Sequence, residues 1–390
     1  MISVDEALSK IEAHKQTSDP ITLHITKCLH YVLAKNVYAL INMPPFRQSA
    51  MDGYAIFIHE NDTYSLVGEI KAGDAPNLSL QKGEAVRIFT GAAVPNSANA
   101  VVMQEKTTVK NNILTINETP KNEQNIRPLG EQIKKGTLAL TKGTALTPSK
   151  LSFLASLGSN QLLVYPKPKV AIVVTGSELT PPGTPLEEGK IYESNSLLLS
   201  ATLQNEQIND FTIYKVKDDY QSTEDLLKKV IDENDFVLVS GGISVGDYDF
   251  VGKALKNLET EEIFYKIKQK PGKPLFFGKK NTTYVFALPG NPASALTCFY
   301  IYALPLLRNF SNQKQTHLSK ITQKITHDYH VKGIRAQFLK AKSSKNGVEI
   351  LGFQSSAMIH GFNNANALVF IPENTSFIKS NEDVEVILLP

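Results

Sequence analysis

"FVLVSGGISVGDYD", residues 236–249, joins an apolar run to a glycine-rich loop that ends in two aspartates. The run Phe236–Val239 contains no polar residue, which is typical of a strand covered on both faces in a parallel sheet. The loop's glycines favour a tight strand-to-helix turn whose backbone N–H groups suit an anion. The carboxylates of Asp247 and Asp249 suit a cation instead. The segment therefore predicts a loop at the end of a buried strand that serves both kinds of ligand.

On both sides of this segment, short apolar runs alternate with amphipathic helices. Such alternation over residues 168–316 predicts a doubly wound, mostly parallel sheet with helices on both faces. The expected strands cover residues 170–174, 211–216, 235–239, 262–268, 274–278 and 282–288. The expected helices cover residues 195–206, 223–233, 249–258 and 292–309, and Ser222 with Asp225 predicts a capping box for the second helix.

The remainder of the 390-residue chain predicts further domains. Ser3 and Glu6 form a capping-box pattern before a helix over residues 4–14, and Pro148 opens another short helix. Short β-like runs between turn residues fill 42–130, and similar runs follow residue 317. The expected fold class is a multi-domain α/β and β protein. Its domains are a linking domain (1–41 plus 131–167), a β-rich domain (42–130), the α/β domain (168–316) and a small C-terminal β-barrel (317–390).

Composition argues against several classes of protein. The 41 basic and 38 acidic residues are interspersed and leave a net charge of +3, which does not favour nucleic acid as a partner. No apolar stretch approaches the ~18 residues that cross a bilayer, and the first residues do not resemble a secretory signal. Cys28 and Cys298 are too few for a disulfide framework and lie outside metal-binding spacings. We therefore expect a cytoplasmic protein that does not bind membranes.

The unusual polar segments all follow predicted strands. "TGSEL" (175–179), "KDD" (217–219), "SGGISVGDYD" (240–249) and "KQKPGKP" (268–274) come directly after a strand, and "LPGNPAS" (288–294) follows a hairpin. In an open parallel sheet, ligands bind outside the carboxyl ends of the strands. The sequence therefore predicts a single site at that edge of the sheet.

Each polar segment also has a purely structural interpretation. Glycines serve tight turns, lysine runs form solvated faces, and acids that follow strands cap helices. The "KPGKP" frame favours an anion site, because two prolines and a glycine restrict the backbone that carries Lys270 and Lys273. Carboxylates beside such lysines fit a Mg²⁺ ion next to a polyanion. The residues concerned are Lys266, Lys268, Lys270, Lys273, Glu178, Asp218, Asp247 and Asp249.

Other signatures of catalysis do not stand out. The eight histidines are scattered, and we assign none of them a role. The P-loop pattern is absent, and no G-x-G-x-x-G follows a strand. Common nucleotide-binding folds are therefore not indicated.

A set of ordered segments carries a resemblance to a known family. In addition to those above, it comprises "SAMDGYA" (49–55), "RIFTGAAVP" (87–95), "VVMQE" (101–105), "RPLGE" (127–131) and "GKIYESN" (189–195). Together they resemble the MoeA family of molybdopterin molybdenumtransferases, to which the E domain of gephyrin also belongs. The resemblance implies an elongated homodimer that inserts molybdate into the dithiolene of adenylylated molybdopterin, with Mg²⁺-dependent release of AMP. It allows a molybdopterin adenylyltransferase and molybdoenzyme apoproteins as transient partners.

The resemblance also implies roles for individual residues. Asp52 and Thr90 would act from the β-rich domain at the sheet domain of the partner subunit. The catalytic residues would be Asp52, Asp218, Asp249, Lys266 and Lys270, with Asp218 and Asp249 as metal ligands. The cofactor-binding residues would be Thr90, Glu178, Ser240, Gly241, Gly242, Ser244, Gly246, Lys273, Pro289, Pro292, Ser294 and Arg335. Ser177 stands where the family commonly has aspartate, and the segments with Arg335, Ser355 and Ser356 match the family only loosely.

Two other functions stay open at this point. A molybdopterin adenylyltransferase resembles the sheet domain alone, and has no place for the N-terminal segments or the C-terminal β domain. A non-catalytic scaffold like gephyrin is the second alternative.

Overall fold

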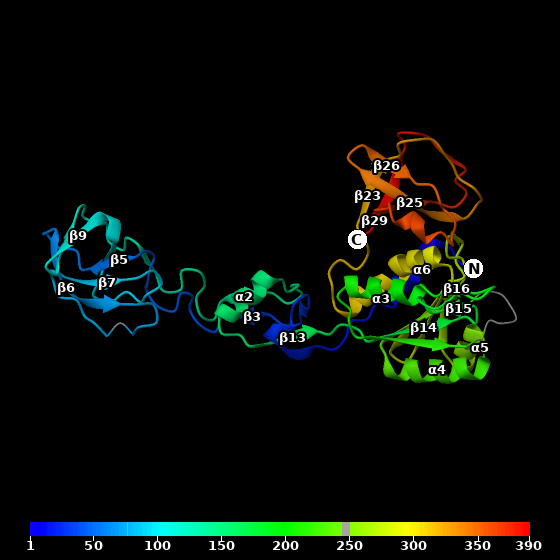
Figure 1. Cartoon of the computed structure of the whole chain (residues 1–390), viewed down its shortest axis with the longest axis horizontal. Helices are drawn as coiled ribbons and strands as arrows, with labels where there is room; N and C mark the ends of the chain where they lie inside the picture. Colours follow the sequence, from blue (N-terminus) through cyan, green and yellow to red (C-terminus); the bar gives the residue numbers. More distant parts are fainter. Residues whose placement is uncertain (76, 218, 244–249) are drawn as a thin grey trace. The chain divides into compact units, whose positions relative to one another are not determined.

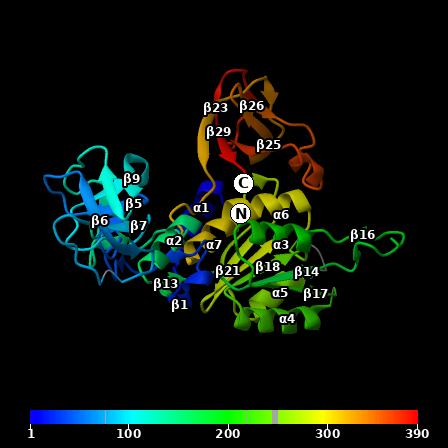
Figure 2. The same ribbon diagram turned by 60° about the vertical axis from the view of Figure 1, so that its left-hand side comes forward.

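The computed structural model describes residues 1–75, 77–217, 219–243 and 250–390. The chain forms two compact units, with Met1–Ile21 and Tyr165–Pro390 in unit 1 and Thr22–Val164 in unit 2. Unit 2 is thus an insertion between two parts of unit 1. Figures 1 and 2 colour the chain from blue at the N-terminus to red at the C-terminus.

The centre of unit 1 is a six-stranded sheet of β14 (Val170–Thr175), β17 (Phe211–Val216), β18 (Phe236–Ser240), β19 (Glu261–Tyr265), β21 (Phe276–Lys280) and β22 (Thr283–Leu288). Its order is β17-β14-β18-β22-β21-β19. β17, β14, β18 and β22 are parallel, and the apolar runs of β14, β18 and β22 are buried throughout, as predicted. β21 and β22 form the expected hairpin, and β19 runs antiparallel to β21. The carboxyl ends of β14, β18, β22 and β19 therefore lie at the same edge.

Helices cover both faces of this sheet (Figures 1 and 2). α4 (Tyr220–Glu233) and α5 (Phe250–Asn257) pack on the face that carries Val237 and Val239. α3 (Asn195–Asn205), α6 (Pro292–Cys298) and α7 (Leu304–Phe310) pack on the face that carries Phe236 and Leu238. Successive strand residues point to opposite faces, so one apolar run supplies two cores. A π-helical turn at Phe299–Ala303 interrupts the expected helix 292–309.

Two of the differences from the prediction have a clear physical cause. α4 begins at Tyr220 rather than at residue 223, because the carboxylate of Asp219 caps it by accepting the Ser222 N–H at 2.8 Å. The predicted capping box of Ser222 and Asp225 is wrong.

The second difference concerns α1 (Val4–Ala13), which Ser3 caps as expected by accepting the Glu6 N–H at 3.1 Å. Residues 1–21 belong to unit 1 and not with the linking residues 22–41. The reason is packing, since Val4, Ala7 and Ile11 lie in the same core cluster as Leu238. Helical periodicity shows that one face is buried, but not which domain buries it.

The C-terminal part of unit 1 is a β domain with its own core, as expected. Its sheet has the order β20-β25-β27-β29-β23, with β26 beside β25, and β24 pairs with β28. β20 pairs with β25 in parallel, which ties the lysine-rich segment to this domain. The strands are β20 (Gln269–Lys270), β23 (Lys320–Lys324), β24 (Tyr329–His330), β25 (Ala336–Ser344), β26 (Gly347–Ile350), β27 (Ala367–Ile371), β28 (Phe377–Ile378) and β29 (Asp383–Leu388).

Unit 2 combines a β-rich part with a linking part. The β-rich part has a sheet of β8 (Ala100–Met103), β5 (Gly53–Ile56), β7 (Glu84–Ile88), β6 (Thr63–Ile70), β10 (Ile113–Ile116) and β9 (Thr107–Lys110), and a pair of β11 (Ile126–Arg127) with β4 (Gln48–Ser49). The linking part holds α2 (Pro148–Ser156), the pair of β3 (Val37–Tyr38) with β12 (Leu138–Leu140), and the sheet of β1 (Ile21–His24), β13 (Gln161–Tyr165) and β2 (Val32–Leu33). Segments from either side of the β-rich part therefore share sheets.

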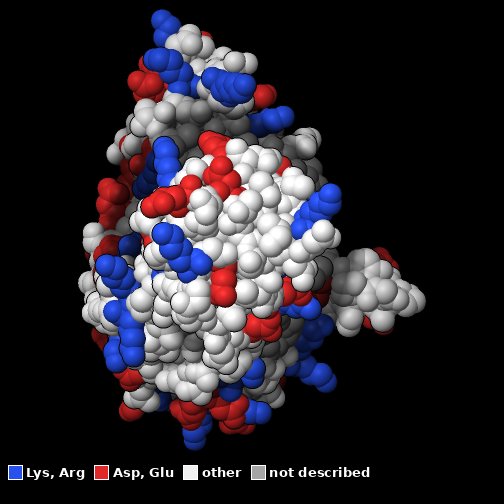
Figure 3. All heavy atoms as spheres, turned by 90° about the vertical axis from the view of Figure 1, so that its left-hand side faces the viewer, with Lys and Arg blue, Asp and Glu red and all other residues white. Residues whose placement is uncertain are grey.

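The surface and the helices add little about partners. None of the described helices combines the length and the apolar character needed to cross a bilayer. On the face shown in Figure 3, basic and acidic side chains are interspersed rather than gathered into one patch, in keeping with the net charge of +3.

Candidate functional site

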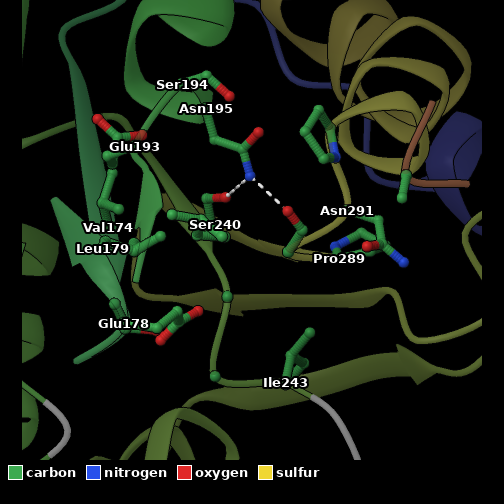
Figure 4. A pocket seen from close by; sticks show the side chains of 18 of the residues that line it. Val174, Glu178, Leu179, Glu193, Ser194, Asn195, Ser240, Ile243, Pro289 and Asn291 are labelled. Atoms are coloured by element: carbon green, nitrogen blue, oxygen red, sulfur yellow. Dashed lines mark hydrogen bonds between the residues drawn. The ribbon is translucent and has the colours of Figure 1, made fainter. Parts of the chain in front are cut away.

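The loops after three neighbouring parallel strands line a pocket of about 670 Å³ in unit 1. Figure 4 shows labelled side chains of all three loops around it. The lining consists of Val174, Thr175, Gly176, Glu178 and Leu179 from β14 onward, Ser240–Ile243 after β18, Pro289–Pro292 after β22, Ile191–Asn195 before α3, and Pro274 and Ala357. The pocket is thus built at the predicted edge of the sheet.

Two glycines allow the loop after β18 to pass close to the loop after β14. Gly241 has φ 93°, and a Cβ there would lie 2.7 Å from the Thr175 carbonyl oxygen. Gly242 has φ 64°, and its Cβ would lie 2.7 Å from a methyl group of Val251. Any other residue at these two positions would introduce both backbone strain and a steric clash, so the fold itself requires glycine here. The same two glycines also line the pocket.

Asn195, at the start of α3, joins the walls of the pocket. Its Nδ2 donates to the Ser240 hydroxyl and to the Gly290 carbonyl oxygen, both at 2.7 Å (Figure 4). These acceptors end β18 and follow β22, so one side chain holds two loops in register. The sequence analysis missed Asn195, because an asparagine before a helix is typical of a cap.

A short ribbon forms another wall that the sequence did not predict. β15 (Leu179–Thr180) pairs in parallel with β16 (Ile191–Tyr192). Lys190 Nζ donates to the Ser177 carbonyl oxygen at 2.6 Å across the base of this ribbon. This hydrogen bond fixes the backbone that precedes Glu178. It uses the carbonyl oxygen of residue 177, so it does not depend on whether the side chain there is serine or aspartate.

The structure brings together many of the predicted site residues. Glu178, Ser240, Gly241, Gly242, Pro289 and Pro292 all line the pocket. Ser294 does not line it and lies on α6 with 2% of its surface exposed. The remaining predicted residues of this group lie outside the described residues: Asp218, Ser244, Gly246, Asp247 and Asp249.

The predicted lysines lie outside the pocket lining, on the segment that leads to Pro274. Lys266 Nζ lies 4.5 Å from the centre of the Tyr265 ring, while Lys270 is half-buried and Lys273 exposed. No carboxylate among the described residues forms an ion pair with any of the three. Their charges are therefore available to an anion, at a place adjoining the pocket.

A buried network fixes the backbone of this lysine segment. The Gln269 side chain is fully buried and donates from Nε2 to the Pro271 carbonyl oxygen at 2.9 Å, while its Oε1 accepts from the Tyr302 hydroxyl. Gly272 has φ 87°, and a Cβ there would lie 2.3 Å from Cys298 Sγ. The predicted restriction of the "KPGKP" backbone therefore has a physical basis beyond its prolines.

The C-terminal domain reaches the site through two contacts. Arg335, a predicted cofactor-binding residue, donates from Nη1 to the Gln269 carbonyl oxygen at 3.0 Å. The Ser356 hydroxyl accepts from Asn291 Nδ2 at 3.1 Å, and Ala357 lines the pocket.

Unit 2 carries its own pair of predicted site residues. Asp52 Oδ1 accepts the Thr90 backbone N–H at 2.7 Å and the Thr90 hydroxyl at 2.8 Å. These hydrogen bonds, with a smaller contribution from Arg87, lower the pKa of the exposed Asp52 carboxyl group. Arg87 lies over the rings of Tyr54 and Phe89, at 4.9 Å and 5.2 Å. Asp52 is therefore held ionised, which suits binding of a metal or a donor rather than proton abstraction.

Metal ligation is not evident from the described residues alone. Within them, no group of three histidine, cysteine, aspartate or glutamate side chains is placed to hold an ion. The Glu193 carboxylate, at the pocket, is occupied by the N–H and hydroxyl of Ser196 at 2.8 Å and 2.5 Å. Glu178 is then the carboxylate of the described pocket lining that could face a metal-bound ligand.

Comparison with known proteins covers almost the whole chain. Residues 2–158 match the MoeA N-terminal region (domains I and II), residues 171–309 a probable molybdopterin binding domain, and residues 323–389 the MoeA C-terminal region (domain IV). Molybdopterin molybdenumtransferases are similar to this chain: that of Staphylococcus epidermidis is 31% identical over 99% of the chain and 95% of its own length. The one from Haemophilus influenzae is 33% identical, covering 99% and 98%.

Solved structures give the same picture. A molybdopterin biosynthesis MoeA protein of Pyrococcus horikoshii is 30% identical with a TM-score of 0.83, and covers 100% of this chain and 99% of its own. Another structure from this organism is 27% identical with a TM-score of 0.76, and covers 100% of both chains.

Proposed function

Because the chain belongs to the MoeA family, we propose that it is a molybdopterin molybdenumtransferase, which inserts molybdenum from molybdate into the dithiolene of adenylylated molybdopterin and releases AMP. The observation that carries this proposal is the pocket of about 670 Å³ at the carboxyl ends of β14, β18 and β22. Its size suits a ligand larger than a single oxyanion. The lysine segment beside it suits the negative charge that all the reactants share.

Charge sets the chemical problem for this reaction. Molybdate, a dithiolate and a phosphoanhydride are all anionic and must come within bonding distance. Two unit charges at ~4 Å repel by about 4 kcal/mol at an effective dielectric constant near 20, which corresponds to a rate loss of roughly a thousandfold. We propose that Lys266, Lys270 and Lys273 offset this repulsion, while the backbone around Gly241 and Gly242 binds phosphate.

Mg²⁺ belongs to the proposal. A carboxylate beside phosphate-binding backbone is the donor set that Mg²⁺ prefers. Glu178 lines the pocket and forms no ion pair with a described residue. Asp218 and Asp249 would hold the ion, with Glu178 nearby. When bound, Mg²⁺ would polarise the scissile phosphate. The chain's lysines would neutralise the oxyanion, and Asn195 would keep the loops after β18 and β22 in register.

AMP release tests the function directly. Adenylylated molybdopterin is supplied with molybdate and Mg²⁺, and the purified chain is expected to release AMP and form molybdenum cofactor. The Glu178→Ala variant is expected to lose at least about tenfold in rate. A chain that adenylylates molybdopterin from ATP would instead be the adenylyltransferase alternative, and a correctly folded chain with no turnover would support a scaffold.

We further propose a homodimer in which Asp52 and Thr90 serve the pocket of the partner subunit. The support is that Asp52 is exposed and held ionised by Thr90, as a residue presented to a ligand should be. Mixing two impaired variants, Asp52→Ala and Glu178→Ala, under subunit exchange tests it against the activity of each variant alone. If the sites are shared, every mixed dimer has one intact site of its two. Random exchange makes about half of the dimers mixed, so about a quarter of the wild-type activity returns. Sites within one subunit give none.

A further inference from the structure

Lys340 is a buried lysine that the proposed mechanism does not use. It lies on β25 with 4% of its surface exposed, and lysines are almost never this buried unless they are paired. No ion pair joins it to a carboxylate among the residues that the structure describes, and burial lowers the pKa of its ammonium group. Such a group costs stability unless its hydrogen bonds compensate, so its contacts indicate why it is there.

The hydrogen bonds of the Lys340 side chain go to one segment of the C-terminal domain, and Nζ also lies 5.6 Å from the centre of the Phe362 ring. Nζ donates to the carbonyl oxygens of Ser355 at 3.3 Å and Met358 at 3.1 Å. These two carbonyls flank Ser356 and Ala357, which contact Asn291 and line the pocket. The ammonium group therefore holds the two sides of the turn that reaches the site.

The same strand position binds this segment through its backbone as well. The Lys340 N–H donates to Gln354 Oε1 at 3.0 Å, and Gln354 Nε2 donates to the Lys340 carbonyl oxygen at 2.8 Å. Gly361 packs on the lysine stem, because a Cβ there would lie 3.1 Å from Lys340 Cδ and Cε. Replacement of Gly361 by a larger residue would displace that stem.

We propose that Lys340 is a positioning residue that holds residues 354–358 against the pocket, so that the C-terminal domain supplies a fixed wall for the pterin substrate. The proposal rests on the proposed function only in naming that substrate. A core lysine with no such role would pack its stem in the same way, but it would not need two carbonyl acceptors on either side of the residues that reach the pocket.

The test compares Lys340→Met with Lys342→Met in the full-length chain. Lys342 lies on the same strand and is exposed, so the two substitutions are chemically identical and differ in the contacts that they remove. In Lys340→Met, hydrogen exchange of the backbone amides in residues 354–362 should quicken by about tenfold or more, since an unpinned segment opens locally. Lys342→Met should exchange like the wild type. If Lys340→Met does not fold, Lys340→Gln, which keeps one amide donor, replaces it.

The kinetic readout separates positioning from simple packing. The KM for adenylylated molybdopterin should rise at least about fivefold in Lys340→Met, with a smaller change in kcat, because a loosened wall weakens binding more than chemistry. Unchanged exchange in residues 354–362 would overturn the proposal. So would faster exchange with a wild-type KM, because the segment would then not serve the pocket. The exchange measurement needs no substrate, so a wild-type chain without transferase activity would refute the proposed function and leave this test standing.

Discussion

At the scale of single residues, the site depends on positions where only one side chain fits. Gly272 combines φ 87° with a neighbour, Cys298 Sγ, that would lie 2.3 Å from an added Cβ. Asn195 uses both hydrogens of one amide to join two loops. Gly272 thus allows the lysine segment to pass close to Cys298, and Asn195 ties the loops after β18 and β22 together.

Gly272→Ala should therefore be strongly destabilising. Left-handed backbone strain and the clash with Cys298 together predict a loss of roughly 2–5 kcal/mol in the free energy of unfolding. Gly333→Ala is the control, because Gly333 has φ 93° but nothing within 4 Å of an added Cβ, so only strain remains, about 1–2 kcal/mol. Denaturant unfolding measures both. Equal losses of stability in the two variants would contradict this prediction, because Cys298 would then move aside for the new methyl group at no cost in free energy.

Thr90→Ala should raise the pKa of Asp52. The variant removes the hydroxyl hydrogen bond and keeps the larger contribution of the Thr90 backbone N–H, so the pKa should rise but stay below its ordinary value of about 3.9. Because the folded-state pKa is depressed, the stabilisation from this pair is present above the ordinary pKa and is lost as the pH falls through the folded value. Carboxyl-carbon chemical shifts across a pH titration give the value. An unchanged pKa would contradict the hydroxyl's role.

At the scale of elements, a buried ion pair joins the C-terminal end of α3 to α7. Arg308 on α7 donates from Nε and Nη2 to the two carboxylate oxygens of Glu206, the C-cap of α3, both at 2.7 Å. The side chains of Arg308 and Glu206 are only 14% and 7% exposed. A bidentate pair of this kind fixes the angle between two helices as well as their distance.

Breaking this pair should cost far more than breaking an exposed one. Glu206→Gln leaves a buried guanidinium group without its counter-charge, so the free energy of unfolding should fall by about 3–5 kcal/mol. Glu118→Gln breaks the pair of Lys106 with Glu118, whose side chains are 46% and 71% exposed, and should leave stability unchanged within error. Thermal unfolding compares the two variants. A similar small effect in both would mean that water reaches Arg308.

Elements also show how far the sequence could predict the site. Glu178, Ser240 and Pro289 were predictable, because carboxyl ends of parallel strands meet at one edge wherever the strands themselves are recognised. Asn195 and Lys340 were not, because their roles depend on partners distant in sequence, such as Gly290 and Ser355. No local pattern marks an amide or an ammonium group whose function is to hold another segment.

At the scale of the whole molecule, the sequence predicted the sheet unit, the β-rich part and the C-terminal β domain, because each has its own periodicity. It placed residues 1–21 with the linking segments, whereas α1 completes the core of unit 1. Amphipathic patterning determines how much of a helix is buried, and long-range packing chooses the partner.

Separate cores predict two unfolding transitions. Leu238 and Leu114 are both fully buried, in unit 1 and unit 2 respectively. Leu238→Ala should lower only the transition of unit 1, and Leu114→Ala only that of unit 2, each by about 2–5 kcal/mol. Calorimetry of the full chain with each variant tests this. If either substitution shifted both transitions equally, the two units would unfold as one.

The placement of α1 has a consequence for biosynthesis. The helix is translated before its core companions, which extend from Leu238 to Phe286 and Leu318. At ~5–20 residues per second, roughly 10–60 s pass between the synthesis of α1 and the synthesis of the residues that bury its apolar face. During that interval the apolar face of α1 is exposed on the nascent chain, and such transient exposure favours aggregation.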